Sequence, residues 1–364
     1  MRILLGVELR FCNSTPFSTV QNPFGRGKTA GRREEEKRSR LRSMGRGGKI
    51  NHAQKKRGDF SERRFCCMSF ILSCESTVDL PFSYVESRKI PVLFYSYLMD
   101  GQTYVDDMLR DSEALPAFYR RLKEGQMATT SQINETDYLN FFDEQLQKGD
   151  LLHLAFGSGM TNSVANAQTA AEKMREKYPN RRLIVLDSLA SSSGYGMLVD
   201  TAADMRDAGA EMEEIEAWVL ANRNRVHHQF YSTDLKYFRR GGRVSGPAAM
   251  IGTILNICPL MHLNADGRII AYGKVRGKKN AIAATVNWMK EHAQGGEKYD
   301  GKCFISHSHC WGDAEETRRE IEAAFPKLRG KVRIFDIGTI IACHTGPGTV
   351  AVFFMGDERE AGEK

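Results

Sequence analysis

The sequence lacks the signals that mark secreted, membrane-spanning and cofactor-binding proteins. Its eight cysteines include no Cys-x-x-Cys pair, and scattered thiols in a long chain favour a reduced, cytoplasmic protein over a disulfide framework. The opening MRILLGVELRFC holds too short an apolar stretch for a signal peptide or a transmembrane helix. No cofactor loop, metal cage or nucleophile elbow stands out. We therefore expect no cofactor, no metal site and no intrinsic catalysis.

Charge divides the chain of 364 residues into two unlike parts. Residues 1–67 hold 17 lysines and arginines against 6 acidic residues, whereas the remainder holds 35 against 39. The first part has almost no apolar periodicity, so we expect a basic, disordered extension, or sequence upstream of a start at Met68. Lysine and arginine clusters attract phosphate, so nucleic-acid binding through this segment is an alternative. We expect no nucleic-acid partner for the folded part.

From Met68 onward, strand and helix signals alternate without an internal repeat. Apolar strands are predicted at 69–74, 88–99, 150–156 and 181–188, and helices at 114–125, 136–149, 163–180, 194–209 and 211–226. This alternation predicts an α/β domain with a largely parallel sheet. The rest of the chain predicts a second, mixed α/β domain, in which an apolar helix ends at Pro259 and residues 331–356 form a strand, a turn and a strand.

The segment 128–134 is predicted as a loop between two helices. It carries three consecutive hydroxyls that can donate to a carboxylate or a phosphate: Thr129, Thr130 and Ser131. Such a cluster is also typical of a turn or of a helix N-cap. Composition alone favours that second interpretation.

A second loop, 156–163, follows a predicted buried strand. Gly157 and Gly159 let a ligand approach the backbone, and Ser158 can donate beside them. The Lys-Ser or Lys-Thr ending of a P-loop is absent from this loop. A glycine-rich connection without any ligand is the alternative.

The order of elements in residues 234–279 resembles the DegV family of bacterial fatty-acid-binding proteins. That family carries DL-x-x-L-x-x-GGRIS, a proline-led apolar element, a DG-x-I turn and K-x-RG-x-KK in the same order as this chain. The segments 129–132 and 156–167 are similar to two further family loops, and His344 begins an H-x-GPG ending. The departures from the family pattern include Glu75, Ile133, Gly157 and Cys258.

The resemblance covers residues 68–359 and implies two α/β domains, at 68–226 and 227–359, with a lipid slot between them. It implies that hydroxyl, glycine and histidine residues hold the carboxylate of a long-chain fatty acid: Thr129, Thr130, Ser131, Ser158, Gly159 and His344. Candidate residues for the wall of the slot are apolar: Met160, Met250, Ile251, Ile254 and Leu255.

The resemblance further implies a carrier that works with a separate ATP-dependent fatty-acid kinase, which forms an acyl-phosphate on the bound lipid. Arg243 and Arg276 lie beside glycines, so we expect both to be exposed near the mouth of the slot, where they contact the kinase or the phosphate. Exposed salt bridges are the alternative for these arginines. Transient contact with a membrane surface is compatible with this role.

Two enzymatic or metal-binding interpretations compete with the carrier. Ser158 with His344 as its base would make a hydrolase or transferase, although a third member of the triad is missing. The SHSHC segment offers His307, His309 and Cys310 as metal ligands on one strand. No further ligand at a suitable spacing completes that site, so we favour a polar strand end.

Overall fold

The computed structural model describes residues 70–243 and 256–361. The basic segment 1–67, Met68 and four apolar wall candidates therefore lie outside the described residues: Met250, Ile251, Ile254 and Leu255. Within the described ranges, no helix combines the length and the apolar character needed to cross a membrane. The described strands form three sheets.

The first sheet has four parallel strands in the order β2-β1-β6-β7. The strands are β1 (Ile71–Glu75), β2 (Val92–Leu93), β6 (Leu151–Ala155) and β7 (Leu183–Asp187). The helices around it are α1 (Phe82–Ser87), α3 (Glu135–Leu146), α4 (Ser163–Lys177), α5 (Ser192–Asp207) and α6 (Met212–Asn222). Every residue of β6 is buried, as expected for a parallel strand covered on both faces. The predicted parallel sheet is confirmed.

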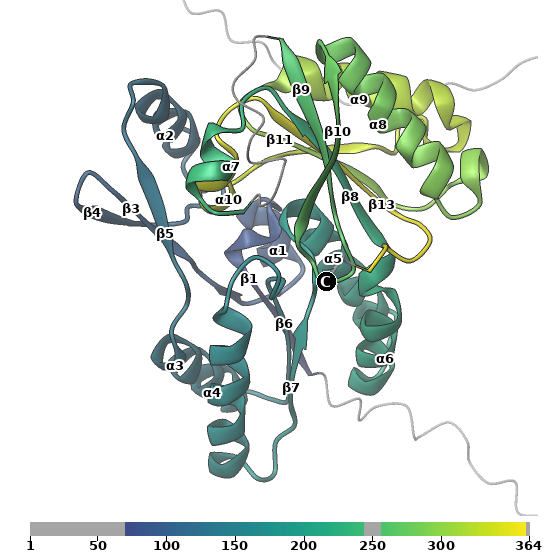
Figure 1. Cartoon of the computed structure of the whole chain (residues 1–364). Coiled ribbons are helices and arrows are strands. Elements are labelled where there is room, and N and C mark those ends of the chain that lie inside the picture. Colours follow the sequence, from purple (N-terminus) through teal and green to yellow (C-terminus); the bar gives the residue numbers. More distant parts are fainter. Residues whose placement is uncertain (1–69, 244–255, 362–364) are drawn as a thin grey trace, which may run out of the picture. The chain divides into compact units, whose positions relative to one another are not determined.

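A small antiparallel sheet, β4-β3-β5, stands beside helix α2 (Ala114–Lys123) (Figure 1). Its strands are β3 (Ser96–Met99), β4 (Gln102–Val105) and β5 (Ala128–Ser131). Asp100 and Gly101 both have positive φ, which closes the tight β3–β4 hairpin. Two predictions are wrong here. The strand predicted at 88–99 is two separate strands, because Val92–Leu93 joins the first sheet and Ser96–Met99 joins the small sheet. The predicted loop at 128–134 begins with β5, because that segment pairs with β3.

The third sheet has six strands in the order β10-β9-β8-β13-β11-β12. They are β8 (Val226–Ser232), β9 (Ile257–Leu263), β10 (Ile269–Arg276), β11 (Cys303–His307), β12 (Arg333–Asp336) and β13 (Thr349–Met355). Only the β11–β12 pair is parallel. This mixed sheet and its helices confirm the predicted mixed α/β fold of the second half. Residues 264–267, which include the Asp-Gly of the DG-x-I element, join β9 to β10.

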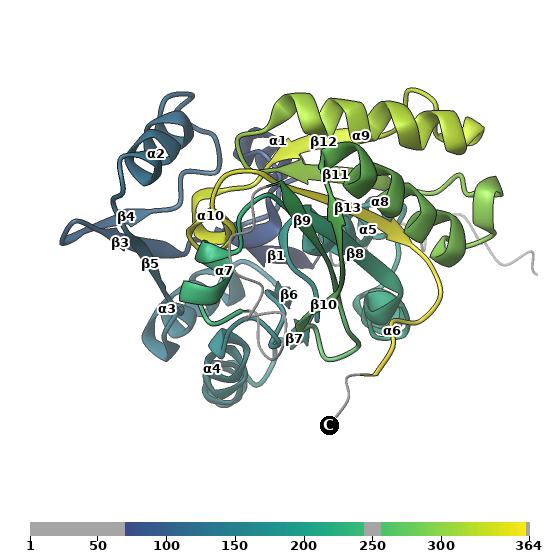
Figure 2. The same ribbon diagram turned by 45° about the horizontal axis from the view of Figure 1, so that its top comes forward.

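The two faces of the third sheet pack against different helices. Helices α8 (Lys278–His292) and α9 (Trp311–Ala324) cover one face, as Figures 1 and 2 show. Side chains alternate along a strand. Tyr231 and Phe354 accordingly join the core beneath α8 and α9, while Phe230 and Phe353 join the core shared with the first sheet. Helix α5 contacts β8, β11 and β13 and links the sheets.

The structure corrects two predictions in the second half. Ile257 and Pro259 belong to strand β9 and not to a helix that ends at the proline. Pro259 is tolerated because β8 pairs only with residues 260–262, so no β8 partner requires its missing N–H. Residues 331–356 contain helix α10 (Thr339–Thr345) between β12 and β13, not a simple turn. Helix α7 (Lys236–Arg240) packs against it.

Four short 3-10 helices complete the described elements: Ser76–Val78, Arg223–Arg225, Gly296–Lys298 and Pro326–Leu328.

Candidate functional site

A cavity of about 640 Å³ lies among the first, the small and the third sheets. Its lining comes from β5, the connections after β6 and β7, strands β8, β9, β10 and β13, and the segment around α7 and α10. The volume falls within the range of about 300–1,000 Å³ that is typical of small-molecule sites. Connections after parallel strands β6 and β7 are the place where α/β sheets usually bind ligands.

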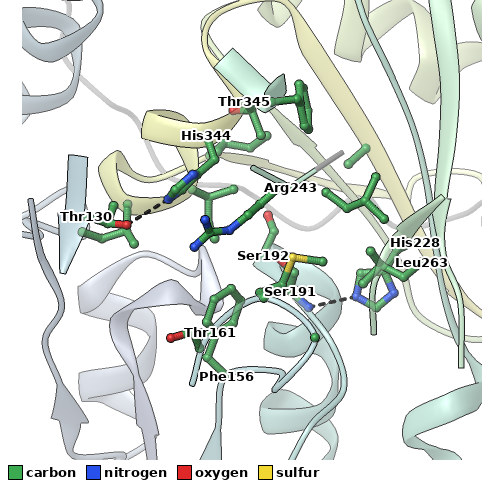
Figure 3. A pocket seen from close by; sticks show the side chains of 18 of the residues that line it. Thr130, Phe156, Thr161, Ser191, Ser192, His228, Arg243, Leu263, His344 and Thr345 are labelled. Carbon is green, nitrogen blue, oxygen red and sulfur yellow. Dashed lines mark hydrogen bonds between the residues drawn. The ribbon is translucent and has the colours of Figure 1, made fainter. Parts of the chain in front are cut away.

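One end of the pocket is polar, and its central contact joins Thr130 to His344 (Figure 3). The Thr130 Oγ1 atom lies 2.9 Å from His344 Nε2. Thr130 comes from the small sheet, and His344 comes from α10, 214 residues later in the chain. The predicted residues Thr130 and His344 therefore meet in the folded protein.

The partly buried His344 ring is neutral near pH 7. Burial, followed by the positive charges of Arg243 and Arg240, lowers the pKa of His344 to about 4. Its Nδ1 atom is buried and has no hydrogen-bond partner among the described residues. An unpaired buried N–H is rarer than an unpaired acceptor, so we assign the proton to Nε2. Nε2 then donates to Thr130, which leaves the Thr130 hydroxyl hydrogen free to point into the pocket.

Glycine 241 fixes how closely α7 approaches this ring. A Cβ atom on Gly241 would lie 2.4 Å from His344 Nδ1, which is too close for any side chain. Gly346, which has a φ of 62°, similarly leaves room for the Tyr237 ring. Gly241 of the GGR element and Gly346 of the H-x-GPG ending therefore allow α7 to pack against α10, and this packing positions His344.

Arg243 differs from the sequence expectation because it is not an exposed turn residue. Its side chain is partly buried and lines the pocket beside His344 (Figure 3). The guanidinium donates to the Gly241 carbonyl, and burial lowers the pKa of Arg243. No carboxylate of residues 70–243 or 256–361 forms an ion pair with it. The polar end therefore contains a positive charge as well as a spare hydroxyl hydrogen.

Ser158 and Gly159 lie where the sequence places them, directly after β6, and both line the pocket. The Ser158 hydroxyl, however, donates to Asp187 Oδ2 at 2.5 Å, and its backbone N–H donates to Asp187 Oδ1 at 3.0 Å. A Cβ atom on Gly159 would lie 2.3 Å from the Gly267 carbonyl oxygen. Ser158 thus has no spare hydrogen, and Gly159 permits contact with the β9–β10 turn.

Only some of the other predicted residues line the pocket. Thr129 is exposed and does not line the pocket, whereas Ser131, also exposed, does. Arg276 is exposed at the end of β10, and Ile269 at the start of that strand lines the pocket. Seven residues at about 3.3 Å each separate the two by roughly 23 Å. Arg276 is therefore remote from this part of the pocket.

The opposite end contains a buried histidine, His228, which was not among the predicted site residues. Its Nε2 atom accepts the Ser191 N–H at 3.1 Å, and its Nδ1 atom lies 2.9 Å from the Val226 carbonyl oxygen. Burial lowers the pKa of His228 well below its ordinary value. Both nitrogens are satisfied within the protein, so the ring behaves as part of an apolar wall. The HH dipeptide at 227–228 is the only sequence signal.

The remaining wall is largely apolar. Of the predicted wall residues, Met160 lines the pocket. The other apolar lining residues were not among the predicted wall residues: Phe156, Phe230, Phe238, Leu263, Ile269, Ile337, Ile340, Ile341, Ala351 and Phe353. Two adjacent isoleucines reach the pocket because α10 is a helix, so the strand predicted there could not have identified them.

A buried carboxylate supports the floor of the pocket. Glu75 is fully buried and accepts hydrogen bonds from Tyr95 at 3.2 Å, from the Phe156 N–H at 2.9 Å and from Tyr138. Tyr95 and Phe156 both line the pocket. Glu75, noted in the sequence only as a departure from the DegV pattern, thus holds two lining residues in place.

The residues of the alternative hydrolase and metal sites bond to other groups in the structure. Ser158 bonds to Asp187 and His344 bonds to Thr130, so these two do not form a nucleophile–base pair. In the SHSHC segment, His307 lies 3.5 Å from Asp336. His309 lies beyond the end of β11 and stacks on Tyr119, and Cys310 donates to a backbone carbonyl.

Three comparisons with known proteins agree with one another. The family model described as an uncharacterised protein of the DegV family matches residues 71–357. A DegV domain-containing protein of Clostridium perfringens is 35% identical over 293 residues, which cover 80% of this chain and 99% of that protein. The structure of a fatty-acid-binding DegV family protein from Thermus thermophilus is 26% identical, with a TM-score of 0.70, and covers 79% of this chain and 100% of the other. The structure of a fatty acid binding DegV family protein from Streptococcus agalactiae is 25% identical, with a TM-score of 0.68, and covers 80% of this chain and 100% of the other.

Proposed function

Because this chain belongs to the DegV family, we propose that it binds a long-chain fatty acid in the pocket and presents the carboxylate to an ATP-dependent kinase. The observation that carries the proposal is the division of the pocket into a polar, positively charged end and an apolar remainder. That division matches the two parts of a fatty acid. The solved relatives from Thermus thermophilus and Streptococcus agalactiae, which bind fatty acids, support the same ligand class.

The carboxylate binds between Thr130 and Arg243. Thr130 has a spare hydroxyl hydrogen because His344 donates to its oxygen, and Arg243 supplies charge and N–H donors. His344 acts through Thr130 and positions its hydrogen. Ser131 is a further donor at the exposed side of the pocket. Ser158 and Gly159 shape the wall, and Thr129, on the outer face of β5, does not contact the ligand.

The acyl chain extends along the apolar lining toward His228. Each methylene that leaves water contributes about 0.8 kcal/mol. A neutral histidine with both nitrogens satisfied does not oppose hydrocarbon as an unsatisfied polar group would. The pocket therefore needs strong polar contacts only at the carboxylate.

The matched pair Thr130→Val and Thr129→Val tests the head-group contact. Thr130→Val removes the donor to a charged group, so fatty-acid affinity should fall by about 10- to 150-fold, which corresponds to about 1.5–3 kcal/mol. Thr129→Val makes the same chemical change on the exposed face of the same strand and should alter affinity by less than about twofold. Calorimetry on delipidated protein measures both. Equal affinities for the two variants would refute the proposed contact.

The kinase part of the proposal assigns docking to surface charge at Arg276. Arg276→Ala should leave fatty-acid affinity unchanged and lower acyl-phosphate formation per bound lipid by up to about fivefold, as expected for one exposed ion pair. A phosphorylation assay with purified fatty-acid kinase and saturating lipid measures this rate. An unchanged rate would remove Arg276 from the kinase surface without affecting the lipid-binding proposal.

A further inference from the structure

Two histidines and a carboxylate meet on the face of β8 that points away from the pocket. They are His227 on β8, His292 at the end of α8, and Asp357 just after β13. One nitrogen of each imidazole and a carboxylate oxygen all lie within 4.8 Å of one another. His227 Nε2 is 2.8 Å from Asp357 Oδ1, and His292 Nδ1 is 3.2 Å from the same oxygen.

The surrounding backbone holds this cluster together. The Asp357 N–H donates to the His292 carbonyl at 3.1 Å, and the Gly356 N–H donates to the Arg225 carbonyl at 2.8 Å. A Cβ atom on Gly356 would lie 2.7 Å from the His227 ring, so only glycine allows the chain to pass here. The His227 and His292 rings are stacked, with centroids 5.1 Å apart. Three elements distant in the sequence thus converge on one point.

The donor set suits a divalent transition-metal ion. Zinc binds imidazole nitrogen and carboxylate oxygen at about 2.0–2.2 Å, which places tetrahedral ligands roughly 3.3 Å apart. The two measured separations are close to that value. His227 is buried, whereas 24% of the His292 side chain and 58% of the Asp357 side chain are exposed. An ion can therefore enter from solvent and keep one coordination position open to water.

Trp288 contacts both histidines of this cluster. Its Nε1–H points at His227 Nδ1 at 3.4 Å, so without an ion the His227 proton is on Nε2 and is donated to Asp357. An ion bound at Nε2 moves that proton to Nδ1, the imidazole stays neutral, and the weak Trp288 contact is lost. The Trp288 ring is also 4.3 Å from the His292 ring. Its fluorescence should therefore change when an ion binds.

We propose that His227, His292 and Asp357 form a binding site for a divalent first-row transition-metal ion, with Zn²⁺ as the best match to the donors. The ion ties the segment after β13 to β8 and α8, on the face of the sheet opposite the pocket. The site is independent of the proposed fatty-acid binding, because none of its three residues lines the pocket.

The test uses tag-free, full-length protein freed of metals with EDTA. Titration with ZnCl₂ should give a saturable change in tryptophan fluorescence and, by calorimetry, one ion per chain at this site. His292→Ala, at a partly exposed position, and Asp357→Asn, at an exposed one, should each raise the dissociation constant by more than about tenfold, the lower bound known for weaker outer-shell changes. The control His309→Ala removes an exposed histidine outside the cluster and should bind like the parent protein.

The outcomes separate the alternatives. Trp288→Phe should abolish the fluorescence change and preserve the calorimetric site. Unchanged fatty-acid binding in His292→Ala and Asp357→Asn shows that these variants are folded. The proposal is overturned if the parent protein shows no saturable zinc binding, or if the fluorescence change and affinity persist in both ligand variants.

Discussion

Each end of the pocket contains a neutral histidine, partly buried in the case of His344 and buried in the case of His228, but the two differ in hydrogen bonding. His228 has a protein partner for both nitrogens. His344 has one partner, Thr130, and its Nδ1 atom is buried without one among the described residues. An end whose polar groups are all satisfied suits hydrocarbon, whereas an end with a spare hydrogen and a nearby cation suits a carboxylate. Hydrogen-bond satisfaction, more than residue type, distinguishes head from tail.

The strongest way to break this comparison is to remove the charge from the polar end. Arg243→Met keeps much of the apolar stem and deletes the guanidinium. Fatty-acid affinity should fall by about 10- to 150-fold, the effect of about 1.5–3 kcal/mol for one hydrogen bond to a charged group. Calorimetry with a saturated fatty acid measures the change.

Arg276→Met provides the matched control, because Arg276 is exposed and absent from the pocket lining. It should change the affinity by less than about twofold. If both variants bind equally well, the positive charge of the pocket does not contribute to carboxylate binding, and the two ends do not differ as we argue.

The sequence could identify which segments matter but could not orient their side chains. Alternating strand and helix patterns predicted the parallel sheet, and the ordered glycine and hydroxyl motifs marked the segments that reach the pocket. Thr129 and Thr130 are chemically identical, and only the pairing of β5 with β3 turns Thr130 inward. Arg243 follows two glycines, which suggested an exposed turn. Its burial results from contacts between α7 and α10, which local sequence does not encode.

The second-half errors have the same origin. The apolar residues before Pro259 have helical spacing, yet from Ile257 onward the chain is a strand, because antiparallel pairing with β10 outweighs local propensity. Residues 339–345 were predicted as part of a strand and a turn, so His344 could be expected near the ligand but not placed over Thr130. His228 and Glu75 were not selected because a buried polar residue gives no distinctive pattern in a single sequence.

The pH dependence of the free energy of unfolding tests the difference between the two histidines, and here we expect an effect of intermediate size. The pKa of His344 is lowered to about 4, against about 6.5 in an unfolded chain. The folded state therefore binds fewer protons between these values, so the free energy of unfolding falls as the pH drops from about 6.5 to about 4. One such group contributes up to about 1.4 kcal/mol per pH unit. His344→Gln should reduce the slope by that amount in lipid-free protein.

Urea unfolding at several pH values between 7 and 5 measures this slope. Bound fatty acid should also flatten the contribution of His344, because a nearby carboxylate favours the protonated imidazole. Bound fatty acid should leave the contribution of His228 to the slope unchanged. Comparing His228→Gln with the parent protein, with and without lipid, measures that contribution. Equal effects of lipid on the two slopes would contradict the placement of the carboxylate beside His344.

The smallest effect is expected from altering the shape of the apolar end. A Cβ atom on Gly194, in α5, would lie 2.3 Å from His228 Nε2 and 2.7 Å from a Phe353 ring carbon. Gly194→Ala should therefore push both side chains toward the pocket and shorten it by about one or two methylenes. Affinity for stearate should fall by about 4- to 15-fold, from about 0.8 kcal/mol per methylene, while laurate should bind nearly as before.

The control Gly196→Ala lies on the same helix and crowds the Val78 carbonyl oxygen at 2.6 Å, away from the pocket lining. It should destabilise the protein in a similar way without favouring either chain length. Equal losses for stearate and laurate in Gly194→Ala would show that His228 does not mark the end of the acyl chain.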